Sequence, residues 1–353
     1  MAWEKLGTAS VSGTPANTSW KELGRTTLGS NGDSIDVTSL ATKDNLMVLC
    51  HTFNTGGAAG AMANQFNGDT GANYSERRST NGGSDGTTTG ATGYNATSGE
   101  WNSSTFHVSN IINIAAQEKL IITSSAMVET AGASNEPRRQ EAVAKWANTS
   151  AQINRINIKN SGAGDFASGS ECIVLGFDND EADSGTNFWQ ELASVTRTDS
   201  GSTLESGNFA AKKYLMVEAC TIPANNGFKG RLEVGHSNGT MDTGSNYADR
   251  YEADGGSDST NASGTYTYAY TNHDDKIQHL KMFIVNKSDK EKLMMWWASS
   301  GGSATGAGNA PQRRNGVAKW ANTSNQITNI RLNNQVAGGD AASGSFIKVY
   351  GAD

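Results

Sequence analysis

The sequence has little of what usually marks a membrane or exported protein. Of its 353 residues only 4 are proline and 3 are cysteine, and no apolar run approaches the roughly 20 residues of a membrane span. The first residues, Met1 to Lys5, have neither the basic start nor the apolar stretch of a signal peptide. We therefore expect no contact with a membrane and no export by a standard signal.

Positive charge is also scarce and scattered. There are 28 Lys and Arg against 35 Asp and Glu, which gives a net charge of −7. The basic residues gather only as the dipeptides Arg77-Arg78, Arg138-Arg139 and Arg313-Arg314. A nucleic-acid-binding surface concentrates positive charge on one face. Nucleic acid is therefore not an expected partner.

Motifs for chemistry are missing as well. The 5 histidines show no close metal spacing, and no phosphate loop, dinucleotide fingerprint or nucleophile elbow occurs. The acids of Asp178 to Asp183 could converge on calcium, but a solvated acidic linker explains them more simply. Cys50, Cys172 and Cys220 are an odd set, typical of buried free thiols in a reducing cytoplasm. We predict no enzyme activity, no cofactor and no metal.

What the sequence does contain is a second copy of itself. Val143 to Ser150 recurs without change as Val317 to Ser324. Trp20-Lys21-Glu22-Leu23 returns as Trp189-Gln190-Glu191-Leu192, and further pairs keep nearly the same offset. Self-similarity of this length indicates homologous structural units. We predict two tandem modules, 19–178 and 188–353, an acidic linker over 179–187 and an N-terminal arm over 1–18.

Composition favours an all-β fold for both modules. The 41 glycines and many Ser, Thr and Asn residues separate short apolar runs, and no segment keeps a helical stripe over four turns. Arg138 to Trp146 is the one place where a short helix competes. We predict two β-sandwich (jelly-roll-like) modules. The expected strands are 46–52, 106–114, 119–124, 153–158 and 171–177 in the first module, and 215–222, 277–285, 292–298, 327–332 and 346–350 in the second.

Aromatic residues that differ between the copies are candidates for contact with a partner. Thr265 to Tyr270 would place Tyr266, Tyr268 and Tyr270 on one face of a strand, and the first module has no equivalent triplet. Such rings fit either a subunit interface or a sugar platform. Trp101 is a further candidate for glycan contact. Trp3 opens a partial third copy of the segment that begins each module, so residues 3–8 are expected to extend a sheet.

Residues that match between the copies are more typical of structure. Trp146 and Trp320 are expected in the core. Asp165 and Asp340 are expected to cap a tight loop before the last strand, where Gly169 and Gly344 supply the turn. Arg139 and Arg313 are expected to pair with Asp85 and Asp258, one pair holding a loop in each module.

One duplicated stretch runs from Arg139 through Lys145-Trp146-Ala147-Asn148-Thr149-Ser150 to Asp165–Glu171 and ends on Val174-Leu175-Gly176. Its second copy ends on Val349-Tyr350-Gly351. This stretch resembles a module of structural proteins from tailed phages, particularly marine ones. The resemblance implies a capsid, decoration or fibre component of the virion, assembled in the host cytoplasm. We expect an outer capsid or decoration protein that forms a homo-oligomer and contacts other virion proteins. A carbohydrate-binding adhesin or tail-fibre receptor-binding protein, with a host surface glycan as partner, is the alternative.

Overall fold

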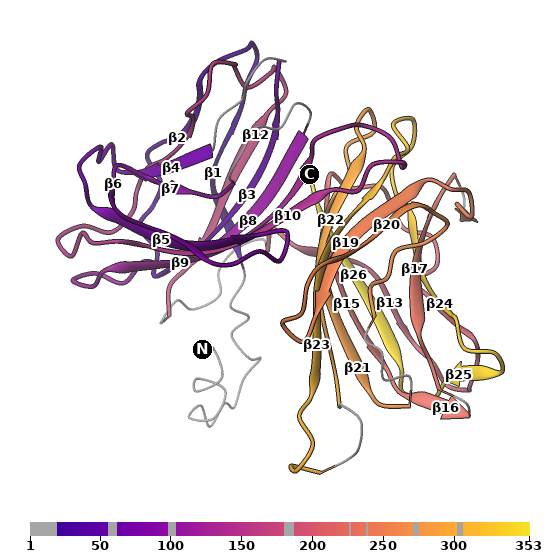
Figure 1. The fold of residues 1–353 in the computed structure, drawn as a ribbon. Coiled ribbons are helices and arrows are strands. Elements are labelled where there is room, and N and C mark those ends of the chain that lie inside the picture. The colour runs from indigo at the N-terminus through magenta and orange to yellow at the C-terminus, as the bar shows by residue number, and fades with distance from the viewer. Residues whose placement is uncertain are drawn as a thin grey trace, which may run out of the picture.

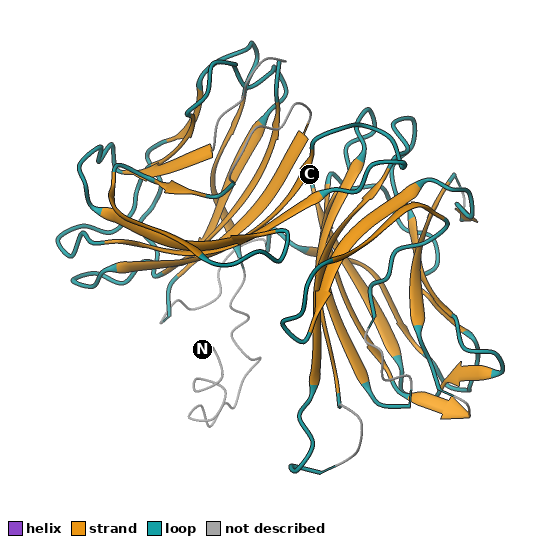
Figure 2. Ribbon diagram, in the orientation of Figure 1, coloured by secondary structure: helices purple, strands orange, loops and turns teal. Residues whose placement is uncertain are grey.

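The computed structural model describes residues 20–55, 62–97, 104–179, 187–225, 227–237, 239–270, 275–301 and 306–353. These residues form strands joined by turns and loops, and no helix occurs among them (Figure 2). Figure 1 shows two layered bodies side by side, the first half of the chain in indigo to magenta and the second in orange to yellow. The predicted all-β sandwich class is confirmed.

In the first half, twelve strands make one eight-stranded and one four-stranded sheet, with the orders β1-β12-β3-β8-β9-β10-β5-β6 and β2-β11-β4-β7. The strands are β1 (Lys21–Thr27), β2 (Ser34–Val37), β3 (Asn45–Phe53), β4 (Met62–Phe66), β5 (Tyr74–Thr80), β6 (Gly86–Ala91), β7 (Tyr94–Asn95), β8 (Ser104–Ile112), β9 (Lys119–Val128), β10 (Arg138–Trp146), β11 (Ile156–Asn160) and β12 (Glu171–Phe177). These strands pair antiparallel.

The second half repeats this plan, with the orders β13-β26-β15-β21-β22-β23-β19-β20 and β14-β24-β17-β18, and adds the two-stranded pair β16-β25. Its strands are β13 (Gln190–Thr196), β14 (Thr203–Glu205), β15 (Tyr214–Thr221), β16 (Pro223–Asn225), β17 (Gly230–His236), β18 (Thr240–Met241), β19 (Tyr247–Ala253), β20 (Ser259–Gly264), β21 (Gln278–Val285), β22 (Lys292–Ser300), β23 (Gln312–Trp320), β24 (Asn329–Asn334), β25 (Gly339–Ala341) and β26 (Phe346–Ala352). The division into two tandem modules, 19–178 and 188–353, stays a prediction.

The strand predicted from the apolar run 171–177 has those bounds as β12, and the other predicted strands overlap observed ones with shifted ends. The segment where a helix competed is strand β10, and its copy is β23. Strand wins there because β10 lies between β9 and β5 and pairs with both along its length. In the copy, Gly316 leaves the space that the ring of Trp296 occupies, since a Cβ at Gly316 would lie 2.4 Å from that ring.

Each half has its own apolar core between the large and the small sheet. Trp146 fills the first core with Phe66 and Tyr74, and Trp320 fills the second with Tyr247. Both tryptophans are fully buried, as expected from their matched positions. Cys50 and Cys172 are also buried here as free thiols, and they lie opposite each other on β3 and β12, whereas Cys220 is half-buried.

A polar frame around each core tryptophan is repeated bond for bond. Trp146 donates its indole Nε1–H to Asp69 Oδ2 at 2.7 Å, and Trp320 donates to Asp242 Oδ2 at 2.7 Å. Asp69 Oδ1 also accepts from the backbone N–H of Gly71 and the side chain of Asn73, as Asp242 Oδ1 does from Gly244 and Asn246. The indole N–H of each tryptophan is partly buried and would otherwise remain unsatisfied, which explains why both copies keep its acceptor.

In each half a buried lysine at the start of β9 or β22 holds the turn that follows the core tryptophan. Lys119 Nζ donates to the carbonyl of Asn148 at 3.1 Å, and Lys292 Nζ donates to that of Asn322 at 2.9 Å. The side chain of each asparagine accepts backbone N–H groups two and three residues later, which forms a closed turn. The unchanged segments Val143–Ser150 and Val317–Ser324 are therefore structural.

Candidate protein-contact surface

The two halves meet through the outer faces of their large sheets, where a third apolar cluster forms. From the first half it takes, among others, Leu49, Phe106, Val108, Val128 and Ile173; from the second, Trp189, Tyr214, Phe283, Val285, Leu293, Met295 and Val317. The ring of Phe106 lies 6.2 Å from that of Tyr214. The small sheets lie on the far sides of this contact (Figure 1). Packing of one sheet face on another is therefore an established behaviour of this chain.

A buried carboxylate anchors the contact at β12. Glu171 accepts hydrogen bonds from Tyr214 Oη at 2.8 Å and from Lys213 Nζ at 3.1 Å, both in the second half, and from Thr27 in the first. Burial opposes ionisation of Glu171, but the hydrogen bonds from Thr27, Tyr214 and Lys213 outweigh it and lower its pKa. The carboxylate is therefore charged at neutral pH and links the halves.

Arg139 joins the two halves, so the predicted pair with Asp85 inside the first module is wrong. Its guanidinium lies 2.6 Å from Asp258 of the second half and 2.9 Å from Glu141, and both Arg139 and Asp258 are buried. Asp85 pairs instead with Arg77, and Arg313 with Glu252. The expected pairing within each module failed because Asp258 follows a turn that reaches the first half, where Gly82 lies against it.

A second ion pair of the interface receives a loop of the first half. Glu291 Oε1 accepts from the N–H of Gly132 at 2.6 Å, and Lys319 Nζ donates to the carbonyl of Thr130 at 2.7 Å. Lys319 is fully buried and lies 3.6 Å from Glu291. The pair thus hydrogen-bonds the backbone of the hairpin between β9 and β10.

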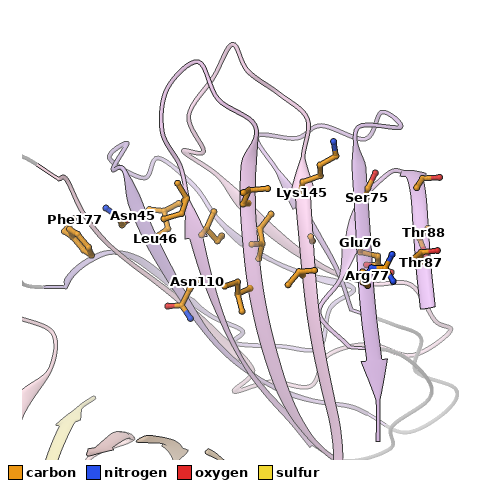
Figure 3. Close-up of a pocket in the computed structure, with 18 of the residues that line it drawn as sticks. Asn45, Leu46, Ser75, Glu76, Arg77, Thr87, Thr88, Asn110, Lys145 and Phe177 are labelled. Atoms are coloured by element: carbon orange, nitrogen blue, oxygen red, sulfur yellow. The ribbon is translucent and has the colours of Figure 1, made fainter. Parts of the chain in front are cut away.

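The same sheet face of the first half carries an exposed apolar patch. Ile112, Leu120, Ile122 and Val143, here called the open patch, are 47%, 58%, 62% and 50% exposed. They line a shallow groove of about 750 Å³ across the large sheet. Figure 3 shows Phe177 and Asn45 at one side of this groove and Ser75, Thr87 and Thr88 at the other.

The open patch has a buried counterpart in the second half. Ile112 pairs with Leu120 across β8 and β9, and Ile122 pairs with Val143 across β9 and β10. In the second half these two cross-strand pairs are Val285 with Leu293 and Met295 with Val317, here called the covered patch. Its four side chains are at most 2% exposed because the first half lies on them.

The charged rim is duplicated as well. Glu118 and Lys145 form an ion pair at 3.2 Å beside the open patch, and both side chains are 43% exposed. They stand where Glu291 and Lys319 stand beside the covered patch, since Lys145 lies opposite Leu120 as Lys319 lies opposite Leu293. The open patch and its ion pair are therefore equivalent to the surface on which, in the second half, the sheet and the β9–β10 hairpin of the first half pack.

The tyrosine face expected on a strand is not formed. β20 ends at Gly264, and residues 265–270 are a turn with one isolated bridge at Thr267. Tyr270 is buried and donates to Gln335 Oε1, while Tyr266 and Tyr268 are half-buried and share a hydrogen bond between their hydroxyls. The rings pack on each other, under Arg231 and Arg314, instead of pointing outward together.

A buried acid lies under this tyrosine cluster. Asp249 accepts the backbone N–H of Tyr268 at 3.0 Å. Burial raises the pKa of Asp249 to about 7, against hydrogen bonds from Tyr268 and Asn261 and the nearby charge of Arg314. The cluster is thus built around a carboxyl group that resists ionisation, which suits a packed interior better than a ligand platform.

The remaining predicted residues gather at no common site. Asp165 and Asp340 do not cap the backbone of their loops as expected: Asp165 hydrogen-bonds Asp33, which raises its pKa, and Asp340 accepts from Asn225. Gly169 and Gly344 do adopt left-handed turns, with φ of 86° and 89°. Trp3, Trp101 and residues 180–186 of the linker lie outside the described residues.

Asp178, the first of the acids considered for calcium, has a structural role. Asp178 lies 2.9 Å from Lys43 Nζ and accepts the N–H of Asp44. Within the described ranges, no three His, Cys, Asp or Glu side chains are grouped so as to hold a metal ion. That part of the chain also lacks any helix with the length and apolarity of a membrane span.

The open patch was missed although the sequence carried a signal for it. Ile111-Ile112 and Leu120-Ile121-Ile122 are apolar on both faces of their strands, where a half-exposed sheet would alternate. Ile111 and Ile121 are buried in the first core, so Ile112, Leu120 and Ile122 point out of it. Consecutive apolar residues in such a strand indicate that both of its faces are packed.

Comparisons with known proteins identify no relative by sequence. The chain matches no protein-family model, and no curated protein matches it. Among solved structures, domains LG4-5 of the mouse laminin alpha1 chain are 10% identical, with 97% of this chain and 92% of that chain covered and a TM-score of 0.19. The botulinum neurotoxin serotype D/C binding domain is 10% identical over 89% of this chain and 94% of that one, with a TM-score of 0.17. Likenesses at such TM-scores carry no argument about fold or function.

Proposed function

We propose that this chain is a structural protein that works by assembly with other protein chains. The observation that carries the proposal is the open patch, an exposed copy of a surface that packs against another sheet elsewhere in the same molecule. Exposed apolar side chains that gather in one place are characteristic of protein contact surfaces. The Glu118–Lys145 pair supplies the polar rim that such surfaces have.

The assembly we propose is a phage virion, with the chain as an outer capsid or decoration component made in the host cytoplasm. Support for this finer assignment comes from the resemblance of the duplicated segment around Trp146 and Trp320 to virion modules. The partners would be other virion proteins and further copies of the chain. No catalytic role is proposed.

Light scattering on the purified chain, followed by electron microscopy, tests the proposal. We expect oligomers of defined size that grow with protein concentration, and binding to virion particles when these are supplied. A chain that stays monomeric, and that neither binds particles nor is found in them, would contradict a role in assembly.

A carbohydrate-binding adhesin remains the second candidate because Tyr266 and Tyr268 keep part of their surface exposed. Against it, Arg231 stacks over the ring of Tyr266 at 4.6 Å and occupies a face that a sugar would need. A glycan array separates the two functions. Binding that is lost in Tyr266→Ala would favour the adhesin.

A further inference from the structure

We propose that the open patch is the contact face of a two-fold dimer in which two copies of this chain pack large sheet against large sheet. The inference deepens the proposed function, on which it rests, by naming the surface and the partner. Its starting point is the repeat: the covered patch occupies the same strand positions and already forms a sheet-on-sheet interface.

The free face of the second half cannot be the partner. In the first half, Leu49, Val108 and Ile173 lie side by side and pack on the covered patch. The second half has Glu218, Lys281 and Lys348 at the same pairings. Lys281 pairs with Glu218 at 3.7 Å, and Lys348 with Glu191 at 3.6 Å. Seating this face on Ile122 and Val143 would take these ion pairs out of water against aliphatic side chains, which is costly. Copies therefore do not add head to tail through this face.

The apolar face of the first half is not available to another copy either, because the second half of its own chain already covers it. The apolar surface that a second copy still exposes at this sheet is its own open patch. A patch that meets its own copy forms an isologous contact, the arrangement of most homodimers. The two-fold arrangement therefore follows from which faces are occupied.

The rim of the open patch suits a two-fold axis. Glu118 and Lys145 lie next to each other at one edge, and Arg77 of the neighbouring strand β5 forms a pair at 3.4 Å with Asp85 of the turn that follows β5. Each edge thus offers both signs of charge, so a rotated copy meets complementary groups wherever the edges face. In the second half the equivalent pair, Glu291 and Lys319, already bonds groups of an opposing surface.

Sedimentation velocity over a range of protein concentrations tests the proposal with one variant and one matched control. Ile122→Lys places a charge at the centre of the open patch, where the side chain is 62% exposed. Ile277→Lys makes the same change at a side chain that is 55% exposed and outside the patch. Both positions are open to solvent, so both variants should fold. We expect a dimer whose Kd rises by at least about tenfold in Ile122→Lys and is unchanged in Ile277→Lys.

Three results would overturn the proposal. A chain that is monomeric up to about 100 µM has no such dimer. A dimer that Ile122→Lys leaves intact forms elsewhere. If deletion of residues 1–18 lets a monomer bind hydrophobic dye at the patch, and Ile122→Lys abolishes that binding, the chain's own N-terminal segment is the occupant. Light scattering detects assembly through any surface, whereas the Ile122→Lys variant tests the open patch alone. The dimer proposal can therefore be wrong while the proposed function stands.

Discussion

The open patch and the covered patch occupy the same strand positions and differ in surroundings. Both consist of two cross-strand aliphatic pairs on the outer face of an eight-stranded sheet. The difference arises from the opposing sheet: the first half offers Leu49, Val108 and Ile173, and the second half offers charged residues at those positions. The two halves therefore share their sheet order, while the side chains on the outer faces determine which surface is closed.

The inner frame of the repeat shows the opposite behaviour. Asp69 with Trp146 and Asp242 with Trp320 keep the same bonds at the same distances. A change of partner costs more folding stability at a buried polar group, which is left without a hydrogen bond, than at an exposed aliphatic group. The two halves are therefore alike where polar groups are buried and diverge where their surfaces meet water or another sheet.

The largest effect should separate the two patches. Met295→Lys places a charge in the buried interface, and we expect it to lower the free energy of unfolding by about 3–5 kcal/mol. Ile122→Lys at the equivalent position of the open patch should change it by no more than about 0.5 kcal/mol in the monomer. Urea denaturation of dilute protein measures both. Equal losses would mean that the open patch is covered within the chain.

The next effect compares two acids at matched positions. Glu76 lies opposite Ala144 as Asp249 lies opposite Ala318. Glu76 accepts from Arg78 and from Asn95, so Glu76→Gln should destabilise the first half. Asp249 accepts hydrogen bonds from the backbone N–H of Tyr268 and the side chain of Asn261, both neutral, and burial raises its pKa to about 7. Asp249→Asn should therefore stabilise the chain at neutral pH.

The pH dependence of this stabilisation follows from the linkage between proton binding and folding. A raised pKa means that the folded state binds the proton more tightly, so the contribution of Asp249 to stability is complete below its unfolded pKa of about 3.9 and is lost as pH rises to about 7. Asp249→Asn should match the native chain near pH 4 and exceed it by about 2–4 kcal/mol above pH 7. Thermal unfolding across this pH range measures the difference. A constant difference at all pH values would contradict a buried, protonated carboxyl group.

Much of this fold could be predicted from the sequence, because apolar runs and glycine-rich turns report local structure directly. The bounds of β12 and the burial of Trp146 and Trp320 followed from such patterns. The polar strands β5, β6, β19 and β20 did not, because Ser, Thr and Asn fill turns and edge strands alike. Only their pairing distinguishes them: β5 and β19 pair with β10 and β23, and β6 and β20 pair in turn with β5 and β19.

The candidate surface was beyond the reach of the repeat alone. Matching one copy to the other indicated which residues are structural, yet it paired Arg139 with Asp85, although its partner is Asp258 of the other half. Contacts between the halves depend on how two sheets are oriented, and no local pattern records that. The strand predicted over Tyr266 to Tyr270 was wrong for a related reason: alternation predicted a strand, but the rings of this segment pack under Arg231 and Arg314.

A smaller effect should be equal in both halves. Asp69→Ala and Asp242→Ala each remove the acceptor of an indole N–H, an asparagine amide and a backbone N–H. We expect each to cost about 1–3 kcal/mol because the indole is left unsatisfied. Chemical denaturation compares them. A difference larger than about 1 kcal/mol would show that the two halves differ in their frames as well as in their faces.

The smallest effect concerns the two ion pairs of the rim. Glu118 and Lys145 are exposed to water, so Glu118→Gln should change the stability of the monomer by less than about 0.5 kcal/mol, and salt should erase the change. Glu291 also accepts the N–H of Gly132 and lies beside the fully buried Lys319. Glu291→Gln should therefore cost about 1–2 kcal/mol and keep most of that cost at high salt, since water and ions do not reach the pair. Double-mutant cycles with Lys145→Met and Lys319→Met, measured at low and high salt, isolate each coupling.

If dimerisation covers the open patch, the coupling of Glu118 with Lys145 should rise toward that of Glu291 with Lys319 at concentrations where the dimer forms. A coupling that stays small in the dimer would place the dimer interface away from this rim.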